Sequence, residues 1–327
     1  MKALVVGYGS MGRRRIRLLK KIMSDVEIIS VDANPARLEQ ARAANLTAYS
    51  NLDDAIAERP DFAFVSTSPA AHADIALSLA KAGINLFTEL NLIDKNYDEI
   101  TAAAKANGSV AFMSSTMLYD KRIQTIADAI KTAAPPPLTY IFHVGQYLPD
   151  WHPWESYKDF FVSQKLTNAI REIYVVQLPW IIELFGEITD VHAIGQKCTT
   201  LELDYPDAAI STFKHANGNI GVFTCDVASR AASTSLEVIN ENIHLFWYGH
   251  NDDLFLYDIE HKKMTQLKAY ETVEHVEGYA DNIIEDRYVD EIKNYLDVIY
   301  KGAEPKYSFE KDKRTLEICD KIEEMIF

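Results

Sequence analysis

The stretch KALVVGYGSMGRRRIRLL, residues 2–19, constrains the fold more than any other part of the chain. An apolar run ends at Val6, and Gly7, Gly9 and Gly12 follow in the spacing GxGxxG where a helix is expected to begin. Glycines at this spacing allow a tight strand-to-helix turn and let backbone N–H groups approach a pyrophosphate. The stretch therefore predicts a dinucleotide site, and the alternative is a glycine-rich turn that serves only packing. The predicted cofactor contacts are Gly7, Tyr8, Gly9, Ser10, Met11 and Gly12.

An acidic residue strengthens this interpretation. Asp32 lies twenty residues after Gly12, at the end of the next apolar run, where a carboxylate can bind the ribose diol of an adenosine. Its charge would repel a 2′-phosphate, so NAD is favoured over NADP. Arg37 is close enough in sequence to soften that preference, which leaves NADP open as a second cofactor.

Three consecutive arginines, residues 13–15, occupy the first turn of the same predicted helix. The helix macrodipole disfavours cations at this end. An anion close by would explain them. The alternative is that their side chains are solvated or pair with acidic residues elsewhere in the chain.

The first 115 or so residues alternate short apolar runs with helical stretches, which is the pattern of a parallel sheet wrapped by crossover helices. Asn34 and Asn51 are predicted helix caps, and Gly83 and Gly108 are predicted to end helices. We expect an α/β fold whose N-terminal part is a doubly wound parallel sheet. The predicted strands are residues 3–6, 27–31, 62–66, 84–88 and 110–113, with a weaker one at 47–49.

The pattern changes after Thr116. The segment TAAPPPL at 132–138 marks a break, and beyond Ile188 long β-branched and aromatic runs are separated by turn signals such as Asn217-Gly218. These features predict an open, mainly antiparallel sheet in a second α/β domain. From Asp281 the helical period returns. We expect one domain at 1–118 and a substrate-binding and oligomerisation domain at 119–327, whose C-terminal helices can pack back on the first.

Composition excludes several classes of protein. The formal net charge of -15 disfavours binding to nucleic acid or to anionic membranes. The three cysteines are far apart and show no metal-ligand spacing, so neither a metal site nor a disulfide framework is indicated. No apolar run reaches the roughly 18 residues that span a bilayer, and residues 1–6 lead directly into the glycine turn instead of a cleavable signal. We expect a cytoplasmic protein.

Four stretches resemble the Gfo/Idh/MocA family of oxidoreductases: VVGYGSMGRR, VDANPAR, STSPAAHADIALSLAKAGINLFTEL and YVDEIKNYLDVIYKGAEPKYSFEKDKRTLEI. The resemblance covers nearly the whole chain. It implies a Rossmann domain joined to a domain with an open antiparallel sheet, which commonly forms the interface of a homodimer or homotetramer. It also implies NAD(P)-dependent hydride transfer on a small-molecule substrate, namely a sugar or sugar nucleotide. In this family the region of the nicotinamide corresponds here to Ser66, Thr67, Ser68, Pro69, His72, Glu89 and Leu90.

The sequence departs from the family where the usual proton-transfer groups stand. The family's Glu-Lys-Pro reads Glu89, Leu90 and Asn91, and its acid and histidine, four residues apart on a helix, read Glu172 and Val176. Oxidation of an alcohol requires a base, and neither leucine nor valine can act as one. A common glycine cluster reads LTNA at 166–169, in which Asn168 is a candidate substrate contact.

The segment QYLPDWHPWESYKDFF, residues 146–161, is rich in side chains suited to a sugar. Trp151 and Trp154 offer flat apolar faces for a pyranose ring, and His152 is a candidate general acid or base together with Tyr157. The alternative is an aromatic corner of the core between the domains. Glu172 is the third candidate for the proton relay.

Three hypotheses of function follow. The first is an active NAD-dependent oxidoreductase with a rewired proton relay. The second is a reductase that needs no strong base, and the third is a catalytically silent sensor that binds the cofactor. Turnover of a sugar-nucleotide panel separates the first from the others.

Overall fold

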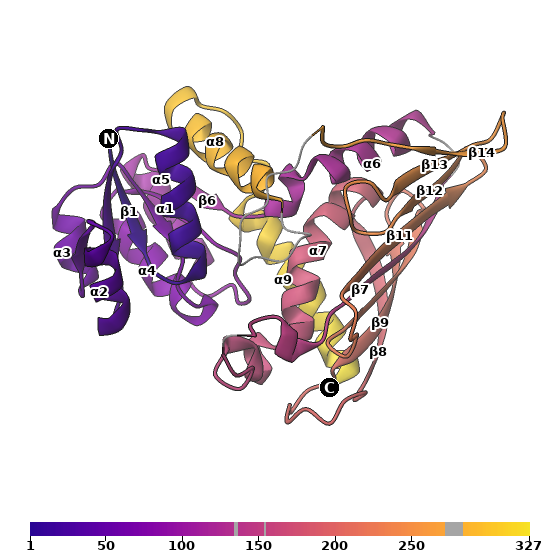
Figure 1. The fold of residues 1–327 in the computed structure, drawn as a ribbon, viewed down its shortest axis with the longest axis horizontal. Helices are drawn as coiled ribbons and strands as arrows, with labels where there is room; N and C mark the ends of the chain where they lie inside the picture. Colours follow the sequence, from indigo (N-terminus) through magenta and orange to yellow (C-terminus); the bar gives the residue numbers. More distant parts are fainter. Residues whose placement is uncertain (134–136, 154, 272–283) are drawn as a thin grey trace. The chain divides into compact units, whose positions relative to one another are not determined.

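The computed structural model describes residues 1–133, 137–153, 155–271 and 284–327, which form two compact units (Figure 1). The first unit combines Met1–Thr116 with Tyr288–Arg314. The second combines Met117–Arg287 with Thr315–Phe327. Each unit is built on its own sheet.

The first unit contains a six-stranded parallel sheet in the order β3-β2-β1-β4-β5-β6. Strand order reverses between β1 and β4, and ligands of such sheets bind beyond the carboxyl ends of the strands at this reversal. The predicted α/β fold with a doubly wound parallel sheet is confirmed. The strands are β1 (Lys2–Val6), β2 (Glu27–Val31), β3 (Thr47–Tyr49), β4 (Phe62–Val65), β5 (Asn85–Thr88) and β6 (Ala111–Met113).

The helices of this unit begin and end at recognisable signals. The Asn34 side chain accepts from the N–H groups of Ala36 and Arg37, which caps the helix that starts at Pro35. Gly83 and Gly108 adopt φ of 71° and 67°, as expected for glycines that follow a helix. The helices are α1 (Ser10–Ile22), α2 (Pro35–Ala43), α3 (Leu52–Ala57), α4 (Pro69–Lys81) and α5 (Tyr97–Asn107).

An aromatic cluster joins the sheet to the C-terminal part of the chain. The helix α8 (Glu285–Lys301) brings Tyr295 to within 6.1 Å of the ring of Phe62, 5.4 Å of Phe64, 5.5 Å of Phe87 and 5.3 Å of Phe112. These rings are fully buried. Aromatic pairs at such separations stabilise a core beyond their burial alone. The helix α9 (Phe309–Ile326) begins in this unit and ends in the second.

The second unit contains an eight-stranded sheet in the order β14-β13-β12-β11-β7-β10-β9-β8. Its neighbouring strands are antiparallel except β7 and β10, so the predicted mainly antiparallel sheet is confirmed. The predicted turn at Asn217-Gly218 joins β9 to β10, with Gly218 at φ 91°. The strands are β7 (Thr139–Gly145), β8 (Ile188–Gln196), β9 (Ala208–His215), β10 (Ile220–Asp226), β11 (Ser233–Asn240), β12 (Ile243–Trp247), β13 (Leu254–Asp258) and β14 (Lys263–Gln266).

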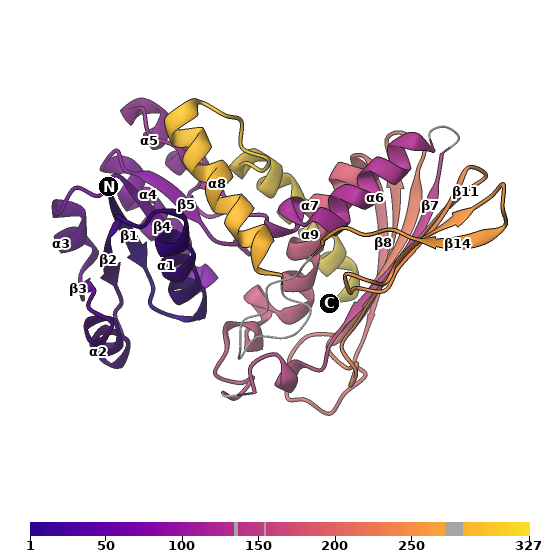
Figure 2. The ribbon, with the colours of Figure 1, turned by 45° about the horizontal axis from the view of Figure 1, so that its top comes forward.

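Helices cover one face of this sheet (Figure 2). Helices α6 (Lys121–Thr132) and α7 (Ala169–Phe185) lie on that face, where Trp180 packs edge-on against Phe142 at 5.0 Å. The opposite face carries isoleucines on four neighbouring strands, with exposed fractions of 48% for Ile141, 69% for Ile194, 46% for Ile210 and 54% for Ile220. In the part of the chain that the structure describes, short 3-10 helices lie in the connections, at Thr116–Tyr119, Leu148–Asp150, Phe161–Ser163 and Lys165–Thr167. Of the helices in the described part of the chain, none has the length and apolar composition that crossing a membrane requires.

Candidate functional site

The glycine turn between β1 and α1 has the geometry that a pyrophosphate needs. Gly7 has φ 99°, and a Cβ there would lie 2.5 Å from the carbonyl oxygen of Ser66. A Cβ on Gly12 would lie 1.8 Å from the carbonyl oxygen of Gly7. Gly9 is open, with only Arg37 Nη1 near its Cβ position at 3.9 Å. Helix α1 starts at Ser10 without a side-chain cap, so its first N–H groups can bind an anion.

Asp32 holds this turn in place. Its Oδ2 accepts from the backbone N–H of Tyr8 at 2.7 Å, and its Oδ1 accepts from that of Asn34 at 2.8 Å. A carboxylate has about four acceptor positions, so ribose hydroxyls can still bind. Arg37 Nη1 lies 3.9 Å from Asp32 Oδ2, and the side chain is half exposed. The structure therefore brings Asp32, Arg37 and the glycine turn close together.

The segment after β4 is held by a buried histidine. The ring nitrogens of His72 lie 2.6 Å from Asn91 Oδ1 and 2.9 Å from the carbonyl oxygen of Thr67. Burial lowers the pKa of His72 and outweighs both hydrogen bonds, so the ring is neutral. A neutral ring carries one N–H, so it donates to one of these two oxygens, since an amide oxygen and a carbonyl oxygen can only accept. The contact between His72 Nε2 and the Thr67 carbonyl oxygen thus helps to fix the position of the loop at Thr67 and Ser68.

The arginine run divides between solvent and core. Arg13 is exposed, whereas the guanidinium of Arg14 lies over the ring of Tyr288 at 4.5 Å and Arg15 is fully buried. Arg15 donates to both oxygens of Glu89 at 2.7 and 2.8 Å and to Glu291 Oε2 at 2.8 Å. For Arg15, pairing with acidic residues is therefore confirmed.

In the network around Arg15, burial disfavours the charged form of both Arg15 and Glu291. The pKa of Arg15 is raised, because the carboxylates of Glu89 and Glu291 outweigh burial. Burial raises the pKa of Glu291, although Arg15 acts against it. Sequence patterns gave no sign of Glu291 as a partner, and the only hint was the unusual position of the arginines at a helix N-terminus. Leu90 follows Glu89 at the end of β5 and is partly exposed.

In the second unit, the aromatic segment at 146–161 is held by its own hydrogen bonds. Trp151 Nε1 donates to the carbonyl oxygen of Gln146 at 3.1 Å. His152 Nδ1 lies 2.6 Å from Glu155 Oε1, and its ring packs on Phe160 at 4.1 Å. The Tyr157 hydroxyl accepts from the N–H of Glu202 at 3.2 Å. Trp154 lies outside the described residues.

Asn168 and Glu172 lie at the start of α7 and differ in environment. Asn168 is buried, caps α7 by accepting from Arg171 N at 2.8 Å, and donates to Lys165 O at 2.8 Å and Glu323 Oε1 at 2.6 Å. Every polar group of its side chain is therefore engaged within the unit. Glu172 is partly exposed as a residue, but its Oε2 is buried without a hydrogen-bond partner. Burial raises the pKa of Glu172 to about 8.

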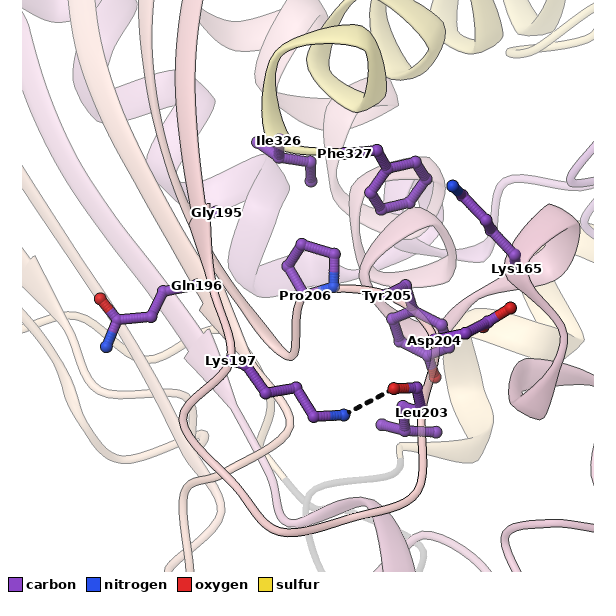
Figure 3. Close-up of a pocket in the computed structure, with 10 residues that line it drawn as sticks. All are labelled: Lys165, Gly195, Gln196, Lys197, Leu203, Asp204, Tyr205, Pro206, Ile326 and Phe327. Carbon is purple, nitrogen blue, oxygen red and sulfur yellow. Dashed lines mark hydrogen bonds between the residues drawn. The ribbon is translucent and has the colours of Figure 1, made fainter.

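A cavity of about 400 Å³ lies elsewhere in the second unit (Figure 3). Lys165, Tyr205 and Phe327 are among its lining residues, and Lys197 on its wall donates to the carbonyl oxygen of Leu203 at 2.9 Å. None of the site residues predicted from the sequence lines it. The cavity therefore adds nothing to the assignment of a cofactor or substrate site.

Comparisons with known proteins agree with the fold. Residues 1–114 match the model of an oxidoreductase family with an NAD-binding Rossmann fold. The chain is similar to a UDP-N-acetylglucosamine 3-dehydrogenase, GnnA, from Acidithiobacillus ferrooxidans, with 16% identity, TM-score 0.79, and coverage of 100% of this chain and 97% of that one. It is also similar to a probable dehydrogenase from Thermotoga maritima, with 17% identity, TM-score 0.78 and coverage of 100% and 96%.

A third similar structure is the WlbA dehydrogenase from Bordetella pertussis in complex with NADH and UDP-GlcNAcA, with 16% identity, TM-score 0.79 and coverage of 99% and 95%. Likeness at these identities extends to the fold of both units and no further. No curated protein sequence matches the chain.

Proposed function

We propose that this chain is an oxidoreductase of the Gfo/Idh/MocA type that transfers hydride between NAD and a sugar or sugar nucleotide through a non-standard proton relay. The match of residues 1–114 to an oxidoreductase family with an NAD-binding Rossmann fold supports this proposal. Two of the similar structures support this substrate class, one named as a UDP-N-acetylglucosamine 3-dehydrogenase and one solved with UDP-GlcNAcA. Gly7, Gly9, Gly12 and Asp32 would hold the cofactor. Bound NAD supplies or accepts the hydride.

The buried carboxyl of Glu172 carries the proposed relay. Leu90 and Val176 cannot transfer a proton, and Glu172 lies four residues before Val176, on the same face of α7. A carboxyl whose pKa is raised to about 8 can both take up and release a proton near neutral pH. His152 and Tyr157 are the other candidates, but the hydrogen bonds with Glu155 and Glu202 give each a structural role.

The test is a turnover assay with NAD and NADH across sugars, sugar nucleotides and their keto forms. We expect turnover by the parent, a loss of about 100-fold or more in Glu172→Gln, and unchanged turnover in the control Glu183→Gln. Glu183 lies exposed on the same helix, so this control makes the same glutamate-to-glutamine substitution at a position outside the proposed relay. Full activity of Glu172→Gln would contradict the relay.

The second candidate function is a catalytically silent sensor that binds NADH. The loss of both usual proton-transfer groups at Leu90 and Val176 favours it. Saturable NADH binding, with no turnover of any compound in the panel, would assign this role. A reductase that needs no strong base would instead turn over a conjugated acceptor and leave Glu172→Gln fully active.

We also propose that the protein is a homodimer or homotetramer joined through the face of the second sheet opposite α7. The exposed isoleucines on β7, β8, β9 and β10 support this, because apolar side chains gathered on one exposed face mark a site of protein–protein contact. Ile194 and Ile210 are directly paired across β8 and β9, so the patch is continuous there.

A further inference from the structure

The surroundings of Glu172 provide it with no cation. Its neighbour Arg171 turns toward α9, where Nη1 lies 2.8 Å from Asp320 Oδ1 and 2.5 Å from Glu323 Oε2. On α6, which packs against α7, Arg122 is bound to Asp120 at 2.5 Å. Among the described residues, no lysine, arginine or histidine forms an ion pair with Glu172.

The hydroxyl groups around the first half of α7 are engaged as well. Tyr205, whose pKa burial raises, donates its hydroxyl proton to the carbonyl oxygen of Val162 at 2.7 Å. Tyr174 Oη lies 2.6 Å from Ser211 Oγ on β9 and also contacts Cys225 on β10. The 3-10 helix at Phe161–Ser163, which also packs on α7, contains no titratable side chain. Nothing in these elements therefore offers Oε2 of Glu172 a proton to accept as a carboxylate.

This environment favours the neutral carboxyl. Glu172 lies in the first turn of α7, where the macrodipole favours a negative charge, yet burial dominates and raises the pKa to about 8. At pH 7 most molecules therefore hold a proton on Glu172. A protonated carboxyl can act as a general acid but not as a base.

We infer that Glu172 is the general acid of a carbonyl reduction at neutral pH, in which the buried carboxyl gives its proton to the oxygen of a keto sugar. The inference rests on the proposed function. The hydride that forms the new C–H bond at the carbonyl carbon would come from reduced nicotinamide bound by the chain. The electron pair of the C=O π bond moves to oxygen, the Glu172 O–H bond breaks, and a hydroxyl forms on the product.

This chemistry limits the class of reaction that can supply the substrate. Glu172 recovers its proton from water, so the balance is one carbonyl, one NADH and one proton consumed for each secondary alcohol formed. The substrate must therefore come from a reaction that creates a carbonyl on the sugar, which is an oxidation of a hydroxyl or a dehydration.

The first experiment requires no substrate. Infrared difference spectra of the full-length protein between pH 6 and pH 10 should show the C=O stretch of a buried carboxyl that disappears with a midpoint near pH 8. The band should be absent in Glu172→Gln, which is isosteric with the protonated carboxyl, and retained in Glu183→Gln. A Glu172 carboxyl that is already ionised at pH 6 would overturn the inference.

The second experiment compares initial rates on keto sugars and keto-sugar nucleotides with NADH against the corresponding alcohols with NAD. We expect kcat/KM for reduction to be level below pH 8 and to fall about tenfold per pH unit above it, and Glu172→Gln to abolish this dependence. Turnover with a pH profile that is unchanged in Glu172→Gln would overturn the role of Glu172 and leave the proposed oxidoreductase intact. The absence of turnover in both directions would remove the proposed function and the inference together.

Discussion

Replacing Arg15 by Met tests whether charge pairing or packing holds the first unit together. Methionine retains an apolar stem against Phe87, over whose ring the guanidinium lies at 4.4 Å, but leaves Glu89 and Glu291 without a cation. Breaking a buried ion pair from one side costs about 3–5 kcal/mol. We expect the lower end, about 3 kcal/mol, because the remaining donors to these carboxylates compensate in part. They are Ser114 Oγ, Ser115 N and Thr116 Oγ1 for Glu291, and Ser66 Oγ for Glu89.

The loss of stability caused by Arg15→Met should depend on pH. Removing Arg15 takes away a charge that lowers the pKa of Glu291, whose pKa burial already raises. A carboxyl with a raised pKa in the folded state makes the protein less stable as pH rises above its unfolded value of about 4.3. The difference in the free energy of unfolding between parent and variant should therefore be largest near pH 7.5 and should shrink toward pH 5.

Urea unfolding at several pH values measures this free energy. Trp151, Trp180 and Trp247 lie in the second unit, so their fluorescence reports that unit, while far-ultraviolet circular dichroism reports both units. Arg42→Met is the control, since Arg42 is exposed on α2, and its effect should stay within about 0.5 kcal/mol. The reasoning would be refuted if Arg15→Met had the parent's free energy of unfolding at pH 7.5, or if its stability fell by the same amount at every pH.

Three further predictions concern cofactor, relay and assembly. Calorimetric titration should show tighter binding of NADH than of NADPH. The variant Asp32→Ser should reduce the difference in affinity between the two cofactors, because it removes a repulsive charge and a ribose ligand together. Tighter binding of NADPH by the parent would contradict this. His152→Ala should lower turnover by less than about tenfold if Glu172 holds the proton, whereas a loss of about 100-fold or more, with cofactor affinity unchanged, would assign the relay to His152. Ile210→Asp should yield monomers in light scattering at micromolar concentration; a monomeric parent would remove the proposed interface.

The sheet of the first unit could be predicted because its signals are local. Apolar runs and the glycine turn lie within a few residues of the structure they form, and the predicted strand at 84–88 differs from β5 (Asn85–Thr88) by one residue. The turn at Asn217-Gly218 could be placed for the same reason, since two residues determine its backbone.

The chemistry of the candidate site depended on contacts that no local pattern records. Glu172 could be named as a relay candidate from the family resemblance, which aligns it with the family's acid, but its raised pKa follows from burial in the folded chain. The segment at 146–161 suggested a sugar site from its side chains alone, and the hydrogen bond of His152 with Glu155 appears only in three dimensions. The partner of Arg15 lies 276 positions away, beyond any pattern of helices or strands.

The separation of Arg15 from Glu291 also determines the order in which the ribosome can complete the first unit. At roughly 5–20 residues per second, about 14–55 s pass between synthesis of Arg15 and of Glu291. For most of that time the nascent chain has made Phe64 and Phe87 but not Tyr295, which packs against both. A folding intermediate with an uncovered aromatic surface is a substrate for chaperones, and a product truncated before α8 should aggregate.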